Sequence, residues 1–100
     1  MKCQKKAVVH WIPLEKTGKP KALSSDAPYY PHIVSEEDLE KRHWSIALFS
    51  TGKNEKNESL ICFSMLADGP EAQTFWESLE TNTRFTLLEG GTPVAYGSIV

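Results

Sequence analysis

The end of the chain carries the feature that most restricts the fold. Two apolar stretches, residues 84–88 and 93–100, flank the motif Glu89-Gly90-Gly91-Thr92. Glycine adopts positive φ angles without steric cost, so a glycine pair between two apolar runs is typical of a tight β-hairpin loop. The pattern predicts a hairpin of two strands that closes a sheet.

Alternation of side chains assigns the faces of this hairpin. Phe85 and Leu87 fall on one face and are expected to point into the core. Gly97 lies inside the second strand, where a glycine marks a bulge or the close approach of another segment. We therefore expect little free space around Gly97 or its neighbour Tyr96.

Four more segments have the composition of strands: residues 7–12, 29–34, 43–50 and 59–67. Between the last of these and the hairpin, one apolar stripe at helical spacing predicts a short helix over residues 70–79, formed by Ala72, Phe75, Trp76 and Leu79. Ser35 and Asp38 have the spacing of a capping box and predict one helical turn that ends by Arg42. Six antiparallel strands with one or two short helical connections indicate an all-β fold, a small barrel.

The length of 100 residues fits a single domain, residues 1–100, in which the polar stretch 1–6 is expected to be mobile. The net charge is −2, which gives no general support for nucleic-acid binding. Cys3 and Cys62 do not form a disulfide framework, so reduced thiols and a cytoplasmic location are expected. The sequence has no window that predicts a membrane span.

Catalytic and metal chemistry find little support in the sequence. His10, His32 and His43 are far apart along the chain and bind zinc only if the fold brings them together. Cys62 with a histidine is a conceivable nucleophile pair, but a cysteine in an apolar strand is usually a small core residue. We expect no catalytic residues, no bound metal and no cofactor, and therefore no enzyme.

One stretch is a candidate contact patch. A long polar loop carries three lysines and is followed by adjacent tyrosines, one of which must face solvent, and by a histidine. Exposed aromatic and basic side chains of this kind contact proteins or single-stranded nucleic acid. The patch comprises Lys16, Lys19, Lys21, Tyr29, Tyr30 and His32.

Two of these stretches resemble a known family. Residues 84–100 are similar to the C-terminal hairpin of the third domain of elongation factor Tu, which has Arg-Phe, an Arg before Glu-Gly-Gly and a basic residue after it. Tyr29-Tyr30-Pro31-His32-Ile33 resembles the Tyr-Arg-Pro-Gln-Phe segment of the same domain. The resemblance follows the order of nearly the whole chain, although residues 35–82 match only in strand pattern. Small bacterial proteins made of this barrel alone belong to the same group.

The resemblance implies a six-stranded antiparallel barrel. In the elongation factor this domain packs on a GTPase domain and contacts tRNA. Here Leu88 and Thr92 replace basic residues of the motif and His32 replaces its glutamine, which disfavours an RNA contact. The chain also lacks the glycine-rich phosphate loop of a nucleotide-binding domain.

Together these observations predict a non-catalytic binding module with a protein partner. The first alternative is an RNA- or tRNA-associated barrel related to translation, and the second, least favoured, is a metal or Cys/His enzyme. No nucleotide or membrane partner is expected.

Overall fold

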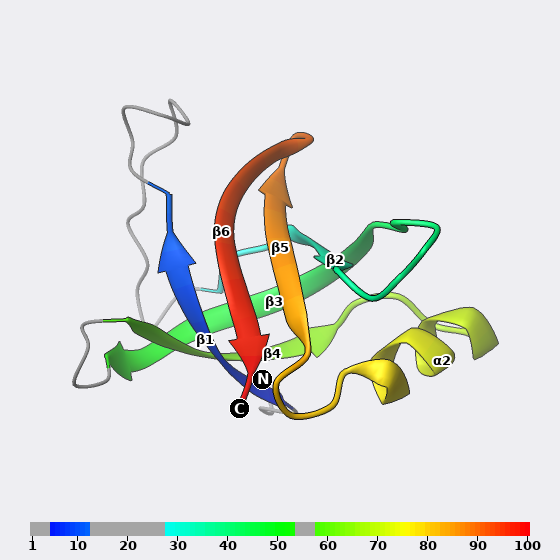
Figure 1. Ribbon diagram of the computed structural model, residues 1–100, viewed down its shortest axis with the longest axis horizontal. Helices are drawn as coiled ribbons and strands as arrows, with labels where there is room; N and C mark the ends of the chain where they lie inside the picture. The colour runs from blue at the N-terminus through cyan, green and yellow to red at the C-terminus, as the bar shows by residue number, and fades with distance from the viewer. Residues whose placement is uncertain (1–4, 13–27, 54–57) are drawn as a thin grey trace.

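The computed structural model describes residues 5–12, 28–53 and 58–100, and these form a closed antiparallel β-barrel with a helix at one end (Figure 1). The strands run around the barrel in the order β1-β4-β3-β2-β5-β6. The all-β, six-stranded barrel predicted from the sequence is therefore confirmed. The elements are β1 (Lys5–Trp11), β2 (His32–Ser35), β3 (Trp44–Lys53), β4 (Ser59–Met65), α2 (Pro70–Ser78), β5 (Arg84–Glu89) and β6 (Thr92–Ile99).

The predicted C-terminal hairpin is formed by β5 and β6. Glu89 pairs with Thr92, so the loop between the strands contains only Gly90 and Gly91. Their φ angles are +58° and +84°. Positive φ at both central residues is the requirement of a type I′ turn, whose twist matches that of the flanking strands. The glycine pair thus fixes the turn, and the pairing shifts by one residue between Leu87 and Leu88, where the hairpin has a bulge.

Gly97 has little free space around it, as predicted. An added Cβ atom would lie 2.7 Å from the Phe85 ring, from the Val8 carbonyl oxygen and from a Val9 methyl group. Phe85 pairs with Gly97 across the hairpin and is completely buried. The glycine therefore makes room for the largest side chain of β5, whereas the neighbouring Tyr96 is exposed on the outside.

The predicted helix, α2, closes one end of the barrel, away from the β5–β6 turn (Figure 1). Pro70 occupies its first turn, where the missing N–H costs no hydrogen bond. Phe75 and Leu79 enter the core, and the Trp44 ring stacks on Phe75 at 5.4 Å. Trp76 meets Phe63 edge to face at 5.5 Å. The apolar stripe of the sequence is thus the surface that packs on the barrel.

The helical turn expected over residues 35–42 is wrong. Two consecutive tight turns stand in its place, and Lys41 has a φ of +52°, which ends any helical path. Ser35 receives the Glu37 backbone N–H at its hydroxyl, two residues on, and its carbonyl receives the N–H of Asp38. Serine side chains bond to nearby backbone in turns as readily as at helix starts, so the capping spacing does not distinguish the two.

The expectation of reduced thiols is also wrong for the cysteine that the structure describes. Cys62 lies in β4, is buried, and is part of a disulfide bond. Cys3 lies outside the described residues. Because disulfides persist in oxidising environments, the cysteine-based inference of a reducing, cytoplasmic setting loses its basis. The bond also removes the free thiol that a Cys/His nucleophile pair requires.

Several strand limits differ from those predicted. β1 begins at Lys5 and so includes two residues of the stretch 1–6 that was expected to be mobile; residues 1–4 lie outside the described part. The segment 29–34 divides: Tyr29 makes an isolated bridge to Leu48, and β2 proper begins only at His32. Pro31, which has no N–H to donate, instead accepts a hydrogen bond from Ile46 through its carbonyl.

Candidate binding surface

The chain from Tyr29 into β2 divides its side chains between the core and the outside. Tyr29 packs against the core and Ile33 lies within it. Tyr30 and His32, at the alternate positions, are exposed. This alternation has the period of two that is expected of a strand, and it places the two adjacent tyrosines on opposite sides of the sheet.

The pairing of the strands places outward-facing residues of neighbouring strands beside His32. His32 pairs with Ser45 of β3 on one side and with Leu88 of β5 on the other. Ser45 in turn accepts a hydrogen bond from the N–H of Leu66, just beyond β4, at 3.0 Å. Residues that are distant in the sequence thus lie in one row on the outer surface. We call the exposed side chains of this surface the β2–β3 face: Tyr30, His32, His43, Ser45 and Leu66.

Two large apolar side chains lie on the β2–β3 face. Tyr30 is 61% exposed and Leu66 is 49% exposed. Ser45 lies between their strands; the buried Ala47 follows it on β3, and the buried Leu88 pairs with His32 on the other side. None of the five residues of the face is Lys, Arg, Asp or Glu.

His32 and His43 meet on this face. His43 directly precedes β3, and because Ile33 pairs with Trp44 the two histidines are diagonal neighbours across the seam between β2 and β3. Their ring centroids lie 6.2 Å apart with an angle of 60° between the planes. The third histidine, His10, is on β1 and pairs with Glu58, so the fold brings together two of the three histidines.

Tyr29 makes contacts within the barrel. Its hydroxyl donates a hydrogen bond to the Glu89 carboxylate at the end of β5, and its ring lies 6.2 Å from that of Trp11. Burial raises the pKa of the Tyr29 phenol above its ordinary value, and the hydrogen bond to Glu89 and its negative charge raise it further. Trp11 donates its indole N–H to the Ser59 hydroxyl at 2.9 Å. These contacts tie β1, β4 and β5 together at this end.

The structure therefore places the predicted patch in two locations. Tyr30 and His32 lie on the β2–β3 face, and Tyr29 lies inside the end of the barrel. Lys16, Lys19 and Lys21 lie outside the described residues. The sequence analysis missed His43, Ser45 and Leu66, because only the register of β2 with β3 and of β3 with β4 brings them beside His32.

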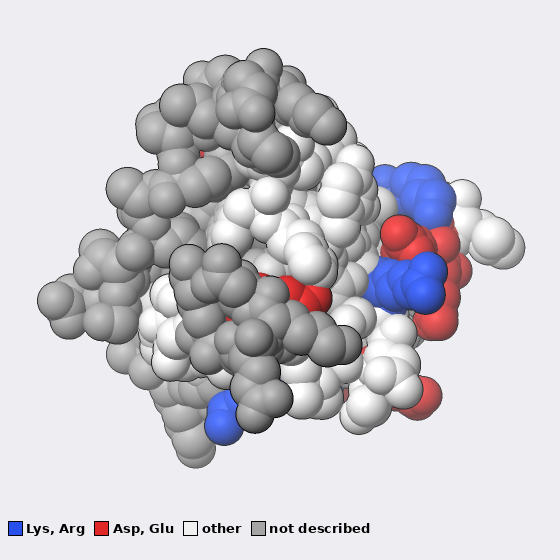
Figure 2. All heavy atoms as spheres, turned by 60° about the vertical axis from the view of Figure 1, so that its left-hand side comes forward, with Lys and Arg blue, Asp and Glu red and all other residues white. Residues whose placement is uncertain are grey.

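Charge on the described surface is mixed. In the view of Figure 2 basic and acidic side chains gather together at the right-hand side, and much of the described surface carries neither. Arg42 illustrates the pattern, since its guanidinium lies 3.4 Å from Asp38 and 3.5 Å from Glu40. A nucleic-acid surface instead gathers Lys and Arg on one side.

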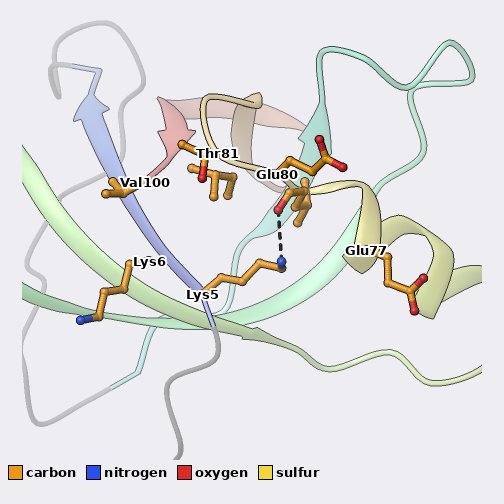
Figure 3. A pocket seen from close by; sticks show the side chains of 8 residues that line it. Lys5, Lys6, Glu77, Glu80, Thr81 and Val100 are labelled. Atoms are coloured by element: carbon orange, nitrogen blue, oxygen red, sulfur yellow. Dashed lines mark hydrogen bonds between the residues drawn. The ribbon is translucent and has the colours of Figure 1, made fainter.

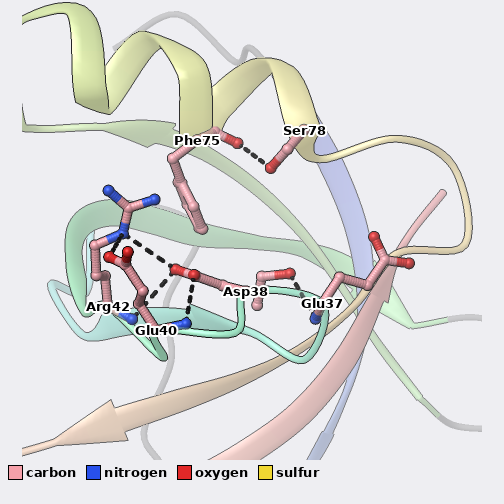
Figure 4. A network of polar contacts seen from close by, with 7 residues as sticks. Glu37, Asp38, Glu40, Arg42, Phe75 and Ser78 are labelled. Carbon is pink, nitrogen blue, oxygen red and sulfur yellow. Dashed lines mark hydrogen bonds and ion pairs between the residues drawn. The ribbon is translucent and has the colours of Figure 1, made fainter.

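The turns after β2 form a compact polar network beside α2 (Figure 4). Asp38 accepts hydrogen bonds from the N–H groups of Glu40 and Arg42 and from the Arg42 side chain. Partial desolvation acts to raise the pKa of Asp38, but these donors outweigh it and leave the pKa below its ordinary value. All of the carboxylate's partners are internal to the turn, so the network orders the segment between β2 and β3.

A hollow of about 650 Å³ lies at the α2 end of the barrel. It is bordered by Lys5, Lys6, Glu77, Glu80 and Thr81 (Figure 3). Lys5 is held there by a hydrogen bond to the Leu79 carbonyl at 3.1 Å and by its position 4.9 Å from the Trp76 ring. Its ammonium group thus fastens β1 to the end of α2.

Within residues 5–12, 28–53 and 58–100, no three or more His, Cys, Asp or Glu side chains gather as a metal centre. No described helix is long and apolar enough to cross a membrane. A comparison with models of known protein families gave no match, and a comparison with curated proteins gave none either.

Proposed function

We propose that this chain is a non-catalytic module that binds another protein through the β2–β3 face. The observation that supports this most directly is the exposure of Tyr30 and Leu66 on one outer surface, beside a row that holds no Lys, Arg, Asp or Glu. Exposed tyrosine is enriched at protein interfaces because it offers a large contact area together with a polar hydroxyl. Charged residues are depleted at the centre of such interfaces, and this face has none.

The closed barrel limits how a partner can bind. Strand addition requires an unpaired sheet edge, and each strand of this barrel has a neighbour on both sides. Side-chain contact with an outer face does not need an edge. The proposal is therefore a face-to-face interface with Tyr30 and Leu66 as its apolar anchors.

We propose that the barrel is of the elongation factor Tu third-domain type, occurring as a small bacterial module. The closed six-stranded antiparallel sheet is compatible with that type, and the Gly-Gly hairpin occupies the place that the resemblance gives it. Leu88, which stands where the family has an arginine, pairs with His32 and is buried. The absence of Lys and Arg from the β2–β3 face favours a protein over RNA.

Photo-crosslinking from a defined position tests the proposal. A benzophenone amino acid replaces Tyr30 in one sample and Leu39 in another, and both are irradiated in cell extract without reductant, which keeps the Cys62 bond intact. Leu39 is the matched control, since it is 97% exposed but lies on the turn outside the face. We expect a discrete protein adduct from position 30 alone. RNA adducts from position 30, or the same adducts from both positions, would contradict the proposal.

A further inference from the structure

We propose that His32 and His43 form a two-imidazole site for a divalent transition metal ion, with zinc or nickel as the ions to test. The two side chains come from opposite sides of the β2–β3 seam and project from the same outer surface. Both are exposed, so an ion reaches them without any opening of the barrel. Nothing in the protein-binding proposal is needed for this inference.

The separation of the rings suits a shared ion. A ring nitrogen binds zinc at about 2.0–2.1 Å, so two imidazoles on one tetrahedral ion have centroids about 5 Å apart. The centroids of His32 and His43 are 6.2 Å apart. Closing the difference requires about 1 Å of movement, which rotation about the side-chain bonds of two exposed residues supplies.

The two imidazole rings determine which metal ions can bind. Imidazole suits zinc, copper and nickel, whereas calcium and magnesium prefer oxygen ligands. The described residues supply no third His, Cys, Asp or Glu at this position. With two protein ligands, the remaining coordination positions of the ion are filled by water, which another ligand can replace.

A metal ion bound by both histidines would connect β2 to the start of β3. Within the strands, β2 and β3 are paired only at His32 with Ser45 and at Ile33 with Trp44. An ion held by one histidine from each side would join the strands where their own pairing is shortest. Because it binds the folded chain and not the unfolded one, it raises the melting temperature, and the rise grows as the free ion concentration exceeds the dissociation constant.

Zinc titration of the untagged protein by calorimetry tests the site. We expect one ion per chain, and we expect His32→Gln and His43→Gln each to weaken binding by about tenfold or more, since a single imidazole loses the effective concentration of the second. His10→Gln is the matched control and should bind as the parent does. A second readout is the melting temperature, which zinc should raise in the parent and in His10→Gln but not in His32→Gln.

Three results would overturn the site. These are no binding by the parent protein, unchanged affinity in both His32→Gln and His43→Gln, or an equal loss in His10→Gln. Circular dichroism of each variant shows whether the barrel is intact, and nickel titration repeats the comparison with a second ion. Failure of this site leaves the crosslinking result unaffected, because the crosslinking experiment uses no metal.

Discussion

The seam between β5 and β6 and the seam between β2 and β3 are built in contrasting ways. The first is paired from Arg84 with Ser98 to Glu89 with Thr92 and is closed by a two-glycine turn. The second has two register pairs within its strands and connects through turns that Asp38 organises. Both seams bury their inward side chains, Phe85 and Leu87 at the long one and Ile33 at the short one. The outward side of the short seam carries the exposed His32 and His43.

In our proposal the two seams serve different purposes. At the long seam the inward positions Phe85 and Leu87 belong to the core, so substitutions there act on stability. At the short seam we propose that the exposed outward positions bind a partner or an ion. The predictions below test this division, beginning with the largest expected effect.

Phe85→Ala should lower the free energy of unfolding by about 3–5 kcal/mol, because it removes a fully buried ring and leaves a cavity. The ring also contacts Phe63 across the core, with centroids 6.1 Å apart. Urea unfolding of the variant and the parent measures the change. A loss below about 1 kcal/mol would mean that the ring is not a core residue, and the register of β5 would have to be revised.

Gly97→Val should lower the free energy of unfolding by about 1–3 kcal/mol, since its Cβ atom would overlap the Phe85 ring and the Val8 carbonyl. Gly97→Ala introduces the same Cβ without the extra methyl groups and should lie between the parent and the valine variant. The midpoints of urea unfolding rank the three proteins. Equal midpoints would contradict the close approach of β1 and β5 at this glycine.

Tyr29→Phe should cost about 1 kcal/mol, the usual contribution of a hydrogen bond such as that from Tyr29 to Glu89. The pH dependence has a defined sign. The pKa of Tyr29 is raised in the folded chain, so the stabilisation is complete below the ordinary tyrosine pKa of about 10 and declines as the pH rises above it.

Urea unfolding at about pH 8 and about pH 11, on either side of the ordinary tyrosine pKa, measures this dependence. The parent should lose more stability between the two values than Tyr29→Phe does. An identical loss in both proteins would show that the Tyr29 hydroxyl is not protected by burial and by Glu89.

The double substitution Tyr30→Ser with Leu66→Ser should change the free energy of unfolding by less than about 0.5 kcal/mol, as expected for exposed positions. Leu39→Ser, on the turn, is its matched control. Thermal and urea unfolding of the three proteins make the measurement. A large loss of stability in the double variant alone would mean that the β2–β3 face supports the barrel and is not kept for binding.

Local signals predicted the framework well. Gly90-Gly91 predicted the hairpin because positive φ at both positions leaves few alternatives, and the spacing of Ala72, Phe75, Trp76 and Leu79 predicted α2. The Ser35–Asp38 spacing failed, because the same side-chain bonds serve a turn and a helix start. The disulfide at Cys62 was missed because spacing along the chain does not reveal which cysteines the fold brings together.

The candidate surface was only half predictable. Alternation places Tyr30 and His32 on the same side, which is a local property, but it does not say that this side faces outward. His43 and Leu66 join them only through the register of three strands, and register depends on the packing of the whole barrel. The sequence also does not show that Tyr29 turns inward, because that depends on Glu89, which lies sixty residues further along the chain.

The most direct test of the central claim is the affinity of the protein captured from position 30 for the parent chain and for the Tyr30→Ser/Leu66→Ser variant. The account predicts a dissociation constant raised by about tenfold or more in the double variant, since apolar anchors carry most of the energy of an interface. Leu39→Ser should bind with the parent's affinity. An unchanged dissociation constant in the double variant would contradict the claim that the β2–β3 face is the binding surface.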